Sequence, residues 1–274
     1  MAEHILVALD KSKFAQTAGE LAKQIAAAQA SRVTALAVVN VRRRSGNFFR
    51  DVAGWLGFEP AIVSGDMADE REEDAQARVG GWAEAARAQG LEAEGKVVVG
   101  KVELSIKAEA DGSDLLVMGL RGETEERYPG QGGAMQAGLA EHLKVPTLFA
   151  VPGSTPLKAV AVGFDGSDDA KHGVAAVRRF LVPLGVEVHG IYIGDDPTVL
   201  DELDGLLPGV AVHKHALPKG AESREEALVA KAKEVGAQVL ALGVHGQSAL
   251  RDFVSGTMTQ AVLRGGELSV LVAH

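Results

Sequence analysis

The sequence predicts an α/β fold in which two tandem, doubly wound domains are each built on a five-stranded parallel sheet. Short apolar runs alternate with longer amphipathic runs, which is the pattern of strands joined by crossover helices. The same succession of motifs occurs twice along the chain. Aromatic residues make up only 4% of a composition that is 46% hydrophobic, so Val, Ala, Leu and Ile must build the core. A chain of 274 residues is long enough for two such cores.

The internal repeat is carried by three pairs of segments: HILVALDKS (4–12) with AVAVGFDGS (159–167), SDLLVMGLRG (113–122) with AQVLALGVHG (237–246), and MQAGL (135–139) with TQAVL (259–263). The members of the last two pairs are separated by the same 124 positions, as Gly119 and Gly243 illustrate. PGSTPL at 152–157 interrupts any regular element and predicts a short linker. We therefore expect domains at 1–153 and 157–274.

Each half gives the same order of elements. Strands are expected near 4–9, 33–40, 93–99, 114–119 and 147–151, and again near 158–164, 186–193, 210–216, 238–243 and 269–273. Helices are expected near 14–29, 68–89, 102–111 and 133–143, and again near 168–181, 221–235 and 257–264, with a short helical piece near 198–206. Right-handed crossovers bring the helix starts to the carboxyl ends of the strands, where open α/β sheets bind ligands.

Composition excludes several classes of function. The formal net charge of −9 argues against a nucleic-acid partner. The chain contains no cysteine, so disulfides, thiolate metal sites and cysteine catalysis are excluded. No apolar run has the length of a signal peptide or a transmembrane segment. These features together predict a cytoplasmic protein.

The stretch LALGVHGQSALRDFVSGTMTQAVL, 240–263, predicts a phosphate-binding loop. Gly243 closes a buried strand and Gly246 follows after a turn, so both allow the backbone to bend and to approach a ligand. Gly256 and Thr257 then open a helix, whose first N–H groups have no partner within the helix and favour an anion. The loop is expected to bend around a sugar or α-phosphate, while the amides of 256–259 bind the distal phosphates.

Asp165 is expected to bind the base or the ribose. The helix that starts at Ser167 already carries Asp168 and Asp169 in its first turn, and these carboxylates occupy its dipole. The phosphates are therefore directed to Gly256, and Asp165 is left to accept hydrogen bonds from an amine or a hydroxyl. An alternative stays open, in which the two glycines only form a turn and Asp165 only starts a helix.

Gly243, Gly246, Gly256 and Thr257 resemble the G-x2-G-x9-G-(S/T) nucleotide motif of the universal stress protein family, and VGFDGS resembles that family's first strand and aspartate. The resemblance covers both halves and implies a Rossmann-like sheet in each. It also implies that ATP, alone or with Mg²⁺, binds in the nucleotide-binding branch, and that TLFAV and SVLVA pair to form an intrachain pseudo-dimer. The predicted nucleotide contacts are Asp165, Gly166, Gly243, Val244, His245, Gly246, Gly256, Thr257, Met258 and Thr259.

The two halves are not expected to bind nucleotide equally. The first half keeps Gly119, Gly122 and Gly132, but has Gly133 in place of the hydroxyl residue. Its loop, ETEERYPGQ at 123–131, is also acidic. A carboxylate about 5 Å from a phosphate costs roughly 3 kcal/mol at an effective dielectric constant of about 20. The second half is therefore predicted to hold the nucleotide, and the first to be degenerate.

Two further features are weighed separately. An insertion at 42–65 concentrates four aromatic residues, Phe48, Phe49, Trp55 and Phe58. Four interpretations of 48–58 stay open: a lid, a surface for a protein partner, a membrane-surface helix and a packed helical excursion. The same segment begins with three arginines, which a solvated loop explains. His213 and His215 alternate on one strand face, yet spacing reveals no third metal ligand, so no metal site is predicted.

Three functions remain open from the sequence. The first is an ATP-binding stress-response or regulatory protein, as a monomer with an intrachain pseudo-dimer or as a homodimer. The second is a slow, Mg²⁺-dependent ATP hydrolase, although no general base with an orienting partner is evident beside the glycine loop and no catalytic residue is assigned. The third is an interaction scaffold that binds no nucleotide.

Overall fold

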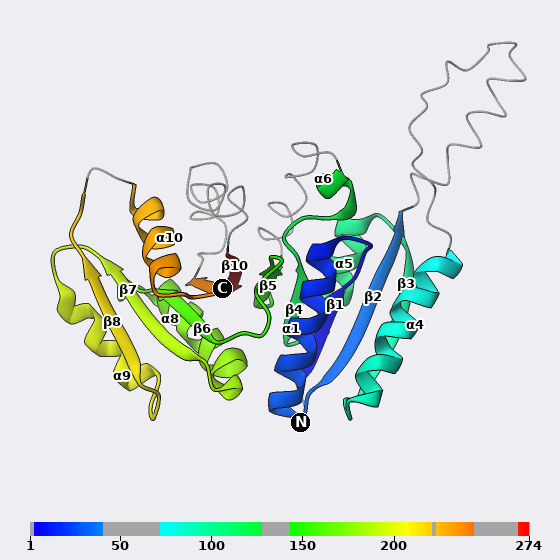
Figure 1. Cartoon of the computed structure of the whole chain (residues 1–274), viewed down its shortest axis with the longest axis horizontal. Coiled ribbons are helices and arrows are strands. Elements are labelled where there is room, and N and C mark those ends of the chain that lie inside the picture. Colours follow the sequence, from blue (N-terminus) through cyan, green and yellow to red (C-terminus); the bar gives the residue numbers. More distant parts are fainter. Residues whose placement is uncertain (1–2, 41–71, 128–142, 221–222, 244–267, 274) are drawn as a thin grey trace, which may run out of the picture.

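The computed structural model describes residues 3–40, 72–127, 143–220, 223–243 and 268–273. Ten strands form one sheet in the order β3-β2-β1-β4-β5-β10-β9-β6-β7-β8 (Figure 1). Among the described strands, all pairs within each half are parallel, and the one antiparallel pair, β5 with β10, joins the halves. The predicted fold class, with five parallel strands in each half, is confirmed. None of the described helices is long and apolar enough to cross a membrane.

The first half has the strands β1 (His4–Ala8), β2 (Arg32–Asn40), β3 (Ala93–Gly100), β4 (Leu115–Gly119) and β5 (Thr147–Ala150). Its helices are α1 (Lys13–Gln29), α4 (Glu72–Ala88), α5 (Val102–Ala110) and the short α6 (Glu123–Arg127). The predicted insertion at 42–65 lies outside the described residues, as does all but the last residue of the helix expected at 133–143.

The second half has the strands β6 (Ala159–Gly163), β7 (Glu187–Ile193), β8 (Val212–Leu217), β9 (Val239–Gly243) and β10 (Ser269–Ala273). Its helical segments are α8 (Asp168–Ala176), η1 (Val177–Leu181), η2 (Val182–Leu184), η3 (Pro197–Asp201), α9 (Glu202–Leu206) and α10 (Arg224–Glu234). The helix expected at 257–264 lies outside the described residues.

Two layers of apolar side chains cover the sheet. Alternate residues of β1 point to opposite faces, so Ile5 and Val7 belong to the layer that includes residues of α1, α4, α8 and η1, whereas Leu6 belongs to the layer that includes residues of α5 and α10. Each layer contains residues from both halves. The core is therefore continuous across the junction.

The junction is an antiparallel pair in which Val270, Leu271 and Val272 lie opposite Phe149, Leu148 and Thr147. This confirms the predicted pairing of TLFAV with SVLVA. Ser269 also fixes the start of the predicted linker, because its Oγ accepts the Val151 N–H at 2.9 Å and lies 2.6 Å from Ser154 Oγ. Ser154 and Ser269 are 4% and 0% exposed, so the linker is packed where it leaves β5. The predicted domain boundaries stay a prediction.

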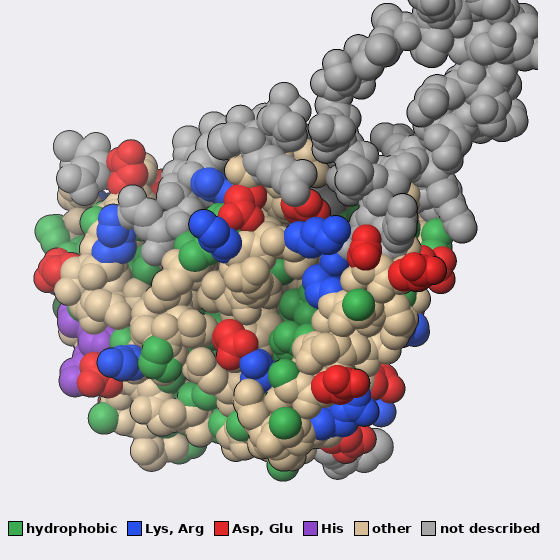
Figure 2. Space-filling model, turned by 45° about the vertical axis from the view of Figure 1, so that its right-hand side comes forward, with side chains coloured by type: hydrophobic (Ala, Val, Ile, Leu, Met, Phe, Trp, Pro, Cys, Tyr) green, Lys and Arg blue, Asp and Glu red, His purple; other side chains and the backbone are tan. Residues whose placement is uncertain are grey.

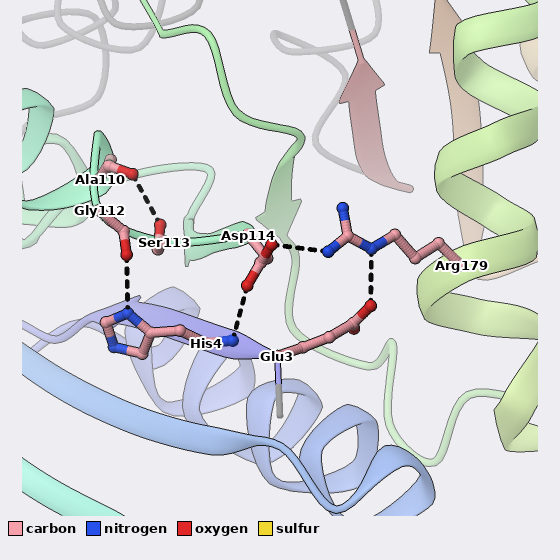
Figure 3. Close-up of polar contacts among 7 residues, drawn as sticks. All are labelled: Glu3, His4, Ala110, Gly112, Ser113, Asp114 and Arg179. Carbon is pink, nitrogen blue, oxygen red and sulfur yellow. Dashed lines mark hydrogen bonds and ion pairs between the residues drawn. The ribbon is translucent and has the colours of Figure 1, made fainter. Parts of the chain in front are cut away.

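A second contact between the halves centres on Arg179 of η1 (Figure 3). Its Nε donates to Glu3 Oε1 and its Nη2 donates to Asp114 Oδ1, both at 2.6 Å. The other oxygen of Asp114 accepts the His4 N–H at 2.9 Å. The hydrogen bond from His4, followed by that from Arg179, lowers the pKa of Asp114 below its ordinary value, although partial burial opposes the shift. Arg179 thus ties the second half to the edge where β1 and β4 begin.

Replacing Arg179 with methionine is expected to lower the free energy of unfolding at pH 7 by about 1 kcal/mol, because Arg179 and Asp114 remain 46% and 38% exposed and water screens the pair. The pKa of Asp114 is lowered in the folded state, so its contribution is present above pH ~4 and is lost as the pH falls through the folded value. Urea unfolding at pH 7 and pH 3 tests this. Arg178→Met is the matched control, and a difference that is unchanged at pH 3 contradicts the assignment.

The structure differs from the predicted elements at two places. The helix expected over 168–181 changes to a π-helical turn at Val177, where the Val182 N–H donates to the Val177 carbonyl. Pro183 follows, and it has no N–H to continue the α-helical pattern. The acidic segment treated as a loop begins with α6, whose first turn contains three glutamates. Negative side chains stabilise the start of a helix, so this pattern is itself a helix signal.

Candidate functional site

The turn between β6 and α8 positions Asp165. Ser167 caps α8 by accepting the Ala170 N–H at 3.2 Å, as its sequence position predicts. Asp165 Oδ1 accepts the N–H and the hydroxyl of Ser167 at 3.1 and 2.6 Å. Both hydrogen bonds that the described residues make to this carboxylate therefore reach Oδ1, and the side chain is exposed. Asp165 stands at the carboxyl edge of the sheet, just after β6 ends.

Gly166 and Gly243 lie at the same edge. Gly166 has a φ of +80°, in the left-handed region that favours glycine. β6 and β9 are neighbours, with Val162 beside Ala241, so Gly243 ends its strand next to the β6–α8 turn. A Cβ on Gly243 would overlap the backbone carbonyl of Asp169 in the first turn of α8. The need for glycine at 243 therefore has a packing cause, which the sequence analysis attributed to ligand approach.

The remaining predicted contacts, Val244, His245, Gly246, Gly256, Thr257, Met258 and Thr259, lie outside the described residues. The structure thus brings together Asp165, Gly166 and Gly243 of the predicted set. It also places the carboxylates of Asp168 and Asp169 in the first turn of α8, as the sequence predicts.

The corresponding edge of the first half is occupied by its own side chains. Asp10, the counterpart of Asp165, accepts the Ser12 N–H at Oδ1 and the Glu123 N–H at Oδ2, at 2.9 and 2.8 Å. Glu126 Oε2 accepts the Lys13 N–H, at the first residue of α1, at 3.0 Å. Segment 121–126 therefore folds back onto the start of α1. Both the Asp10 carboxylate and the Lys13 N–H, an amide that would attract an anion, therefore already have hydrogen-bond partners in the first half.

Sequence reasoning missed these two contacts. The glutamates of 123–126 were identified as charges that repel phosphate, but not as hydrogen-bond acceptors for the N–H of Lys13 at the start of α1. No spacing rule relates Glu126 to Lys13, because the pair is 113 residues apart in sequence. Three glutamates within four residues mark the start of α6 itself, and they carry no local signal for the contact with α1.

No family model and no curated protein matches this sequence. A solved structure of a universal stress protein from Archaeoglobus fulgidus DSM 4304 is similar over 99% of this chain and 96% of its own, with a TM-score of 0.70 and 18% identity. The chain has the tandem fold of the universal stress proteins. A second structure, assigned to the universal stress proteins of Pseudomonas aeruginosa UCBPP-PA14, covers 99% and 93% with a TM-score of 0.61 and 16% identity.

A solved structure from another kind of protein is also similar to this chain. The cytoplasmic domain of a prokaryotic cation chloride cotransporter is similar over 99% of this chain and 95% of its own, with a TM-score of 0.55 and 8% identity. A shared fold at these identities does not assign a ligand. The evidence on function lies at the carboxyl ends of the strands in the two halves.

Proposed function

We propose that this chain is an adenine-nucleotide-binding protein whose second half holds one ATP, with or without Mg²⁺, and whose occupancy serves a stress-response or regulatory role. The supporting observation is that the first half fills its own edge, where Glu126 Oε2 accepts the Lys13 N–H at the start of α1 at 3.0 Å. Asp10 Oδ2 also accepts the Glu123 N–H, at 2.8 Å. Asp165, exposed at the equivalent edge of the second half, is proposed to accept a hydrogen bond from a hydroxyl or amine of the nucleotide.

The glycine spacing supports the phosphate part of the proposal. Gly256 and Thr257 open a predicted helix, and helix amides bind phosphate. The acidic first turn of α8 disfavours a triphosphate at that helix start, because Asp168 and Asp169 lie there. The proposal therefore assigns the base or ribose to Asp165 and the phosphates to 256–259. The stress-response role is proposed from the fold shared with universal stress proteins.

Asp165→Ala is expected to weaken ATP binding at least tenfold, which is about 1.4 kcal/mol and within the range for a lost hydrogen bond to a charged group. Gly256→Asp is expected to abolish binding, because it places a carboxylate beside the phosphates. Isothermal titration calorimetry of the full chain measures both. Asp10→Ala is the matched control in the first half and should leave the affinity within about twofold.

The opposite pattern would overturn the proposal. If Asp10→Ala weakens ATP binding and Asp165→Ala does not, the nucleotide is in the first half. Phosphate release in the same samples distinguishes a binding protein from a hydrolase. Repeated turnover of ATP with Mg²⁺ would favour the hydrolase. Titrations with millimolar ATP that release no heat would favour the scaffold that binds no nucleotide.

A further inference from the structure

Three histidines meet on one face of the sheet at its second-half edge. His189 of β7 and His213 of β8 are directly paired in the parallel register, and His215 lies two residues farther along β8 on the same face. The sequence analysis found His213 and His215 but no third ligand, because strand register is not readable from spacing. Figure 2 shows histidine side chains reaching the surface together on one side of the molecule.

The imidazole rings are within direct contact of one another. His189 Nδ1 lies 3.1 Å from His215 Nε2, and the ring centroid of His189 is 4.9 Å from that of His213 and 5.4 Å from that of His215. Imidazole nitrogens bind Zn²⁺ at about 2.0–2.1 Å, so two such ligands separated by about 100° at the metal are about 3.1 Å apart. The nitrogen pair therefore already has the spacing of two neighbouring metal ligands.

The other nitrogen of His189 supports this assignment. His189 is 7% exposed, and its buried Nε2 has no hydrogen-bond partner among the described residues. Glu187 Oε2 lies 3.8 Å from this Nε2. Metal-binding histidines usually donate their second ring N–H to a carboxylate or carbonyl. A metal on Nδ1 would fix the proton on Nε2, where a small movement of Glu187 supplies the missing acceptor.

The surroundings of His189 and His215 disfavour the protonated form of both rings. Burial, followed by the neighbouring His213 and His215, lowers the pKa of His189 below its ordinary value. Burial, followed by Lys231 of α10, does the same for His215. The charge of Lys231 is balanced by Glu234, whose Oε1 is 2.6 Å from Lys231 Nζ.

We infer that His189 and His215, joined by His213, form a binding site for a late first-row divalent metal ion such as Zn²⁺, with Glu187 as the carboxylate that orients His189. In the described residues no three His, Asp or Glu side chains already converge on one point. His189 Nδ1 and His215 Nε2 share a hydrogen bond at 3.1 Å, and a metal would replace the shared proton. His213, exposed and stacked on His189, would have to turn its ring to supply the third ligand. Imidazole ligands favour Zn²⁺, Cu²⁺ and Ni²⁺ over Mg²⁺.

The test is Zn²⁺ binding by the tag-free full chain, measured by competition with a chromophoric chelator at pH 7.5. We expect His189→Gln and His215→Gln each to weaken Zn²⁺ binding at this site at least tenfold, and 1 mM Mg²⁺ to leave it unchanged. His172→Gln is the matched control, because His172 is exposed on α8, across the sheet, and should bind as the unaltered chain does.

The inference is overturned if the unaltered chain binds no Zn²⁺, or if His172→Gln weakens binding as much as the two cluster variants. Nitrogen-detected NMR of the unaltered chain keeps the test independent of variant folding. Zn²⁺ should shift the ring nitrogens of His189, His213 and His215, and shifts confined to other histidines contradict the site.

Discussion

Replacing Gly243 with alanine is expected to remove about 3 kcal/mol or more of the free energy of unfolding. The added Cβ would overlap the backbone carbonyl of Asp169 and approach the Ala170 nitrogen to 2.8 Å. Backbone atoms in the first turn of α8 cannot rotate away as a side chain can, so the whole helix must shift. Urea unfolding followed by circular dichroism measures the change.

Gly81→Ala is the matched control for this prediction. Gly81 is exposed within α4, and an added Cβ meets nothing within 4 Å. Alanine there should stabilise the chain by up to about 1 kcal/mol, since glycine disfavours a helix interior. A Gly243→Ala variant of unchanged stability that fails to bind ATP would contradict the packing explanation and restore the ligand-approach role.

Phe149→Ala is expected to cost about 3–5 kcal/mol, the range for truncating a buried phenylalanine. Phe149 is 1% exposed in β5 and lies opposite Val270 of β10. It belongs to an apolar layer that contains Leu116 of the first half and Leu240 of the second. The loss should therefore destabilise both halves together, not one alone.

Parallel urea titrations by tryptophan fluorescence and by circular dichroism check this prediction, because both tryptophans are in the first half and circular dichroism reports on the whole chain. Coincident transitions at lower urea indicate one cooperative unit. Phe149→Leu is the conservative control and should cost less than about 1.5 kcal/mol. Two separated transitions in the unaltered chain would contradict a core shared by the halves.

The strands and most helices follow from the sequence because their signals are local. The segment predicted as a strand at 269–273 is β10, and the serines that end the repeated motif, Ser12 and Ser167, cap α1 and α8. The pairing of β5 with β10 was expected through the family resemblance, and the structure confirms it. Apolar periodicity and capping depend on neighbours within a few residues, so one sequence suffices to read them.

The parts that sequence reasoning missed are contacts between distant segments. Glu126 reaches Lys13, His189 lies beside His213, and Asp169 closes against Gly243. Each depends on strand register or on the packing of a helix against a strand end. The sequence position of Gly243 indicated that a glycine is needed there. The reason for that need, the close approach of the first turn of α8, became visible only in the structure. The contacts proposed for 244–259 stay a prediction.

The central claim is that the second half holds ATP while the first half has filled its own site with Asp10 and Glu126. The number of ATP molecules bound per chain tests it most directly, measured by calorimetry on nucleotide-free protein with Mg²⁺ present. The account predicts one ATP per chain, lost in Asp165→Ala and Gly256→Asp and retained in Asp10→Ala. Two ATP molecules per chain, or one that Asp10→Ala removes, would contradict it.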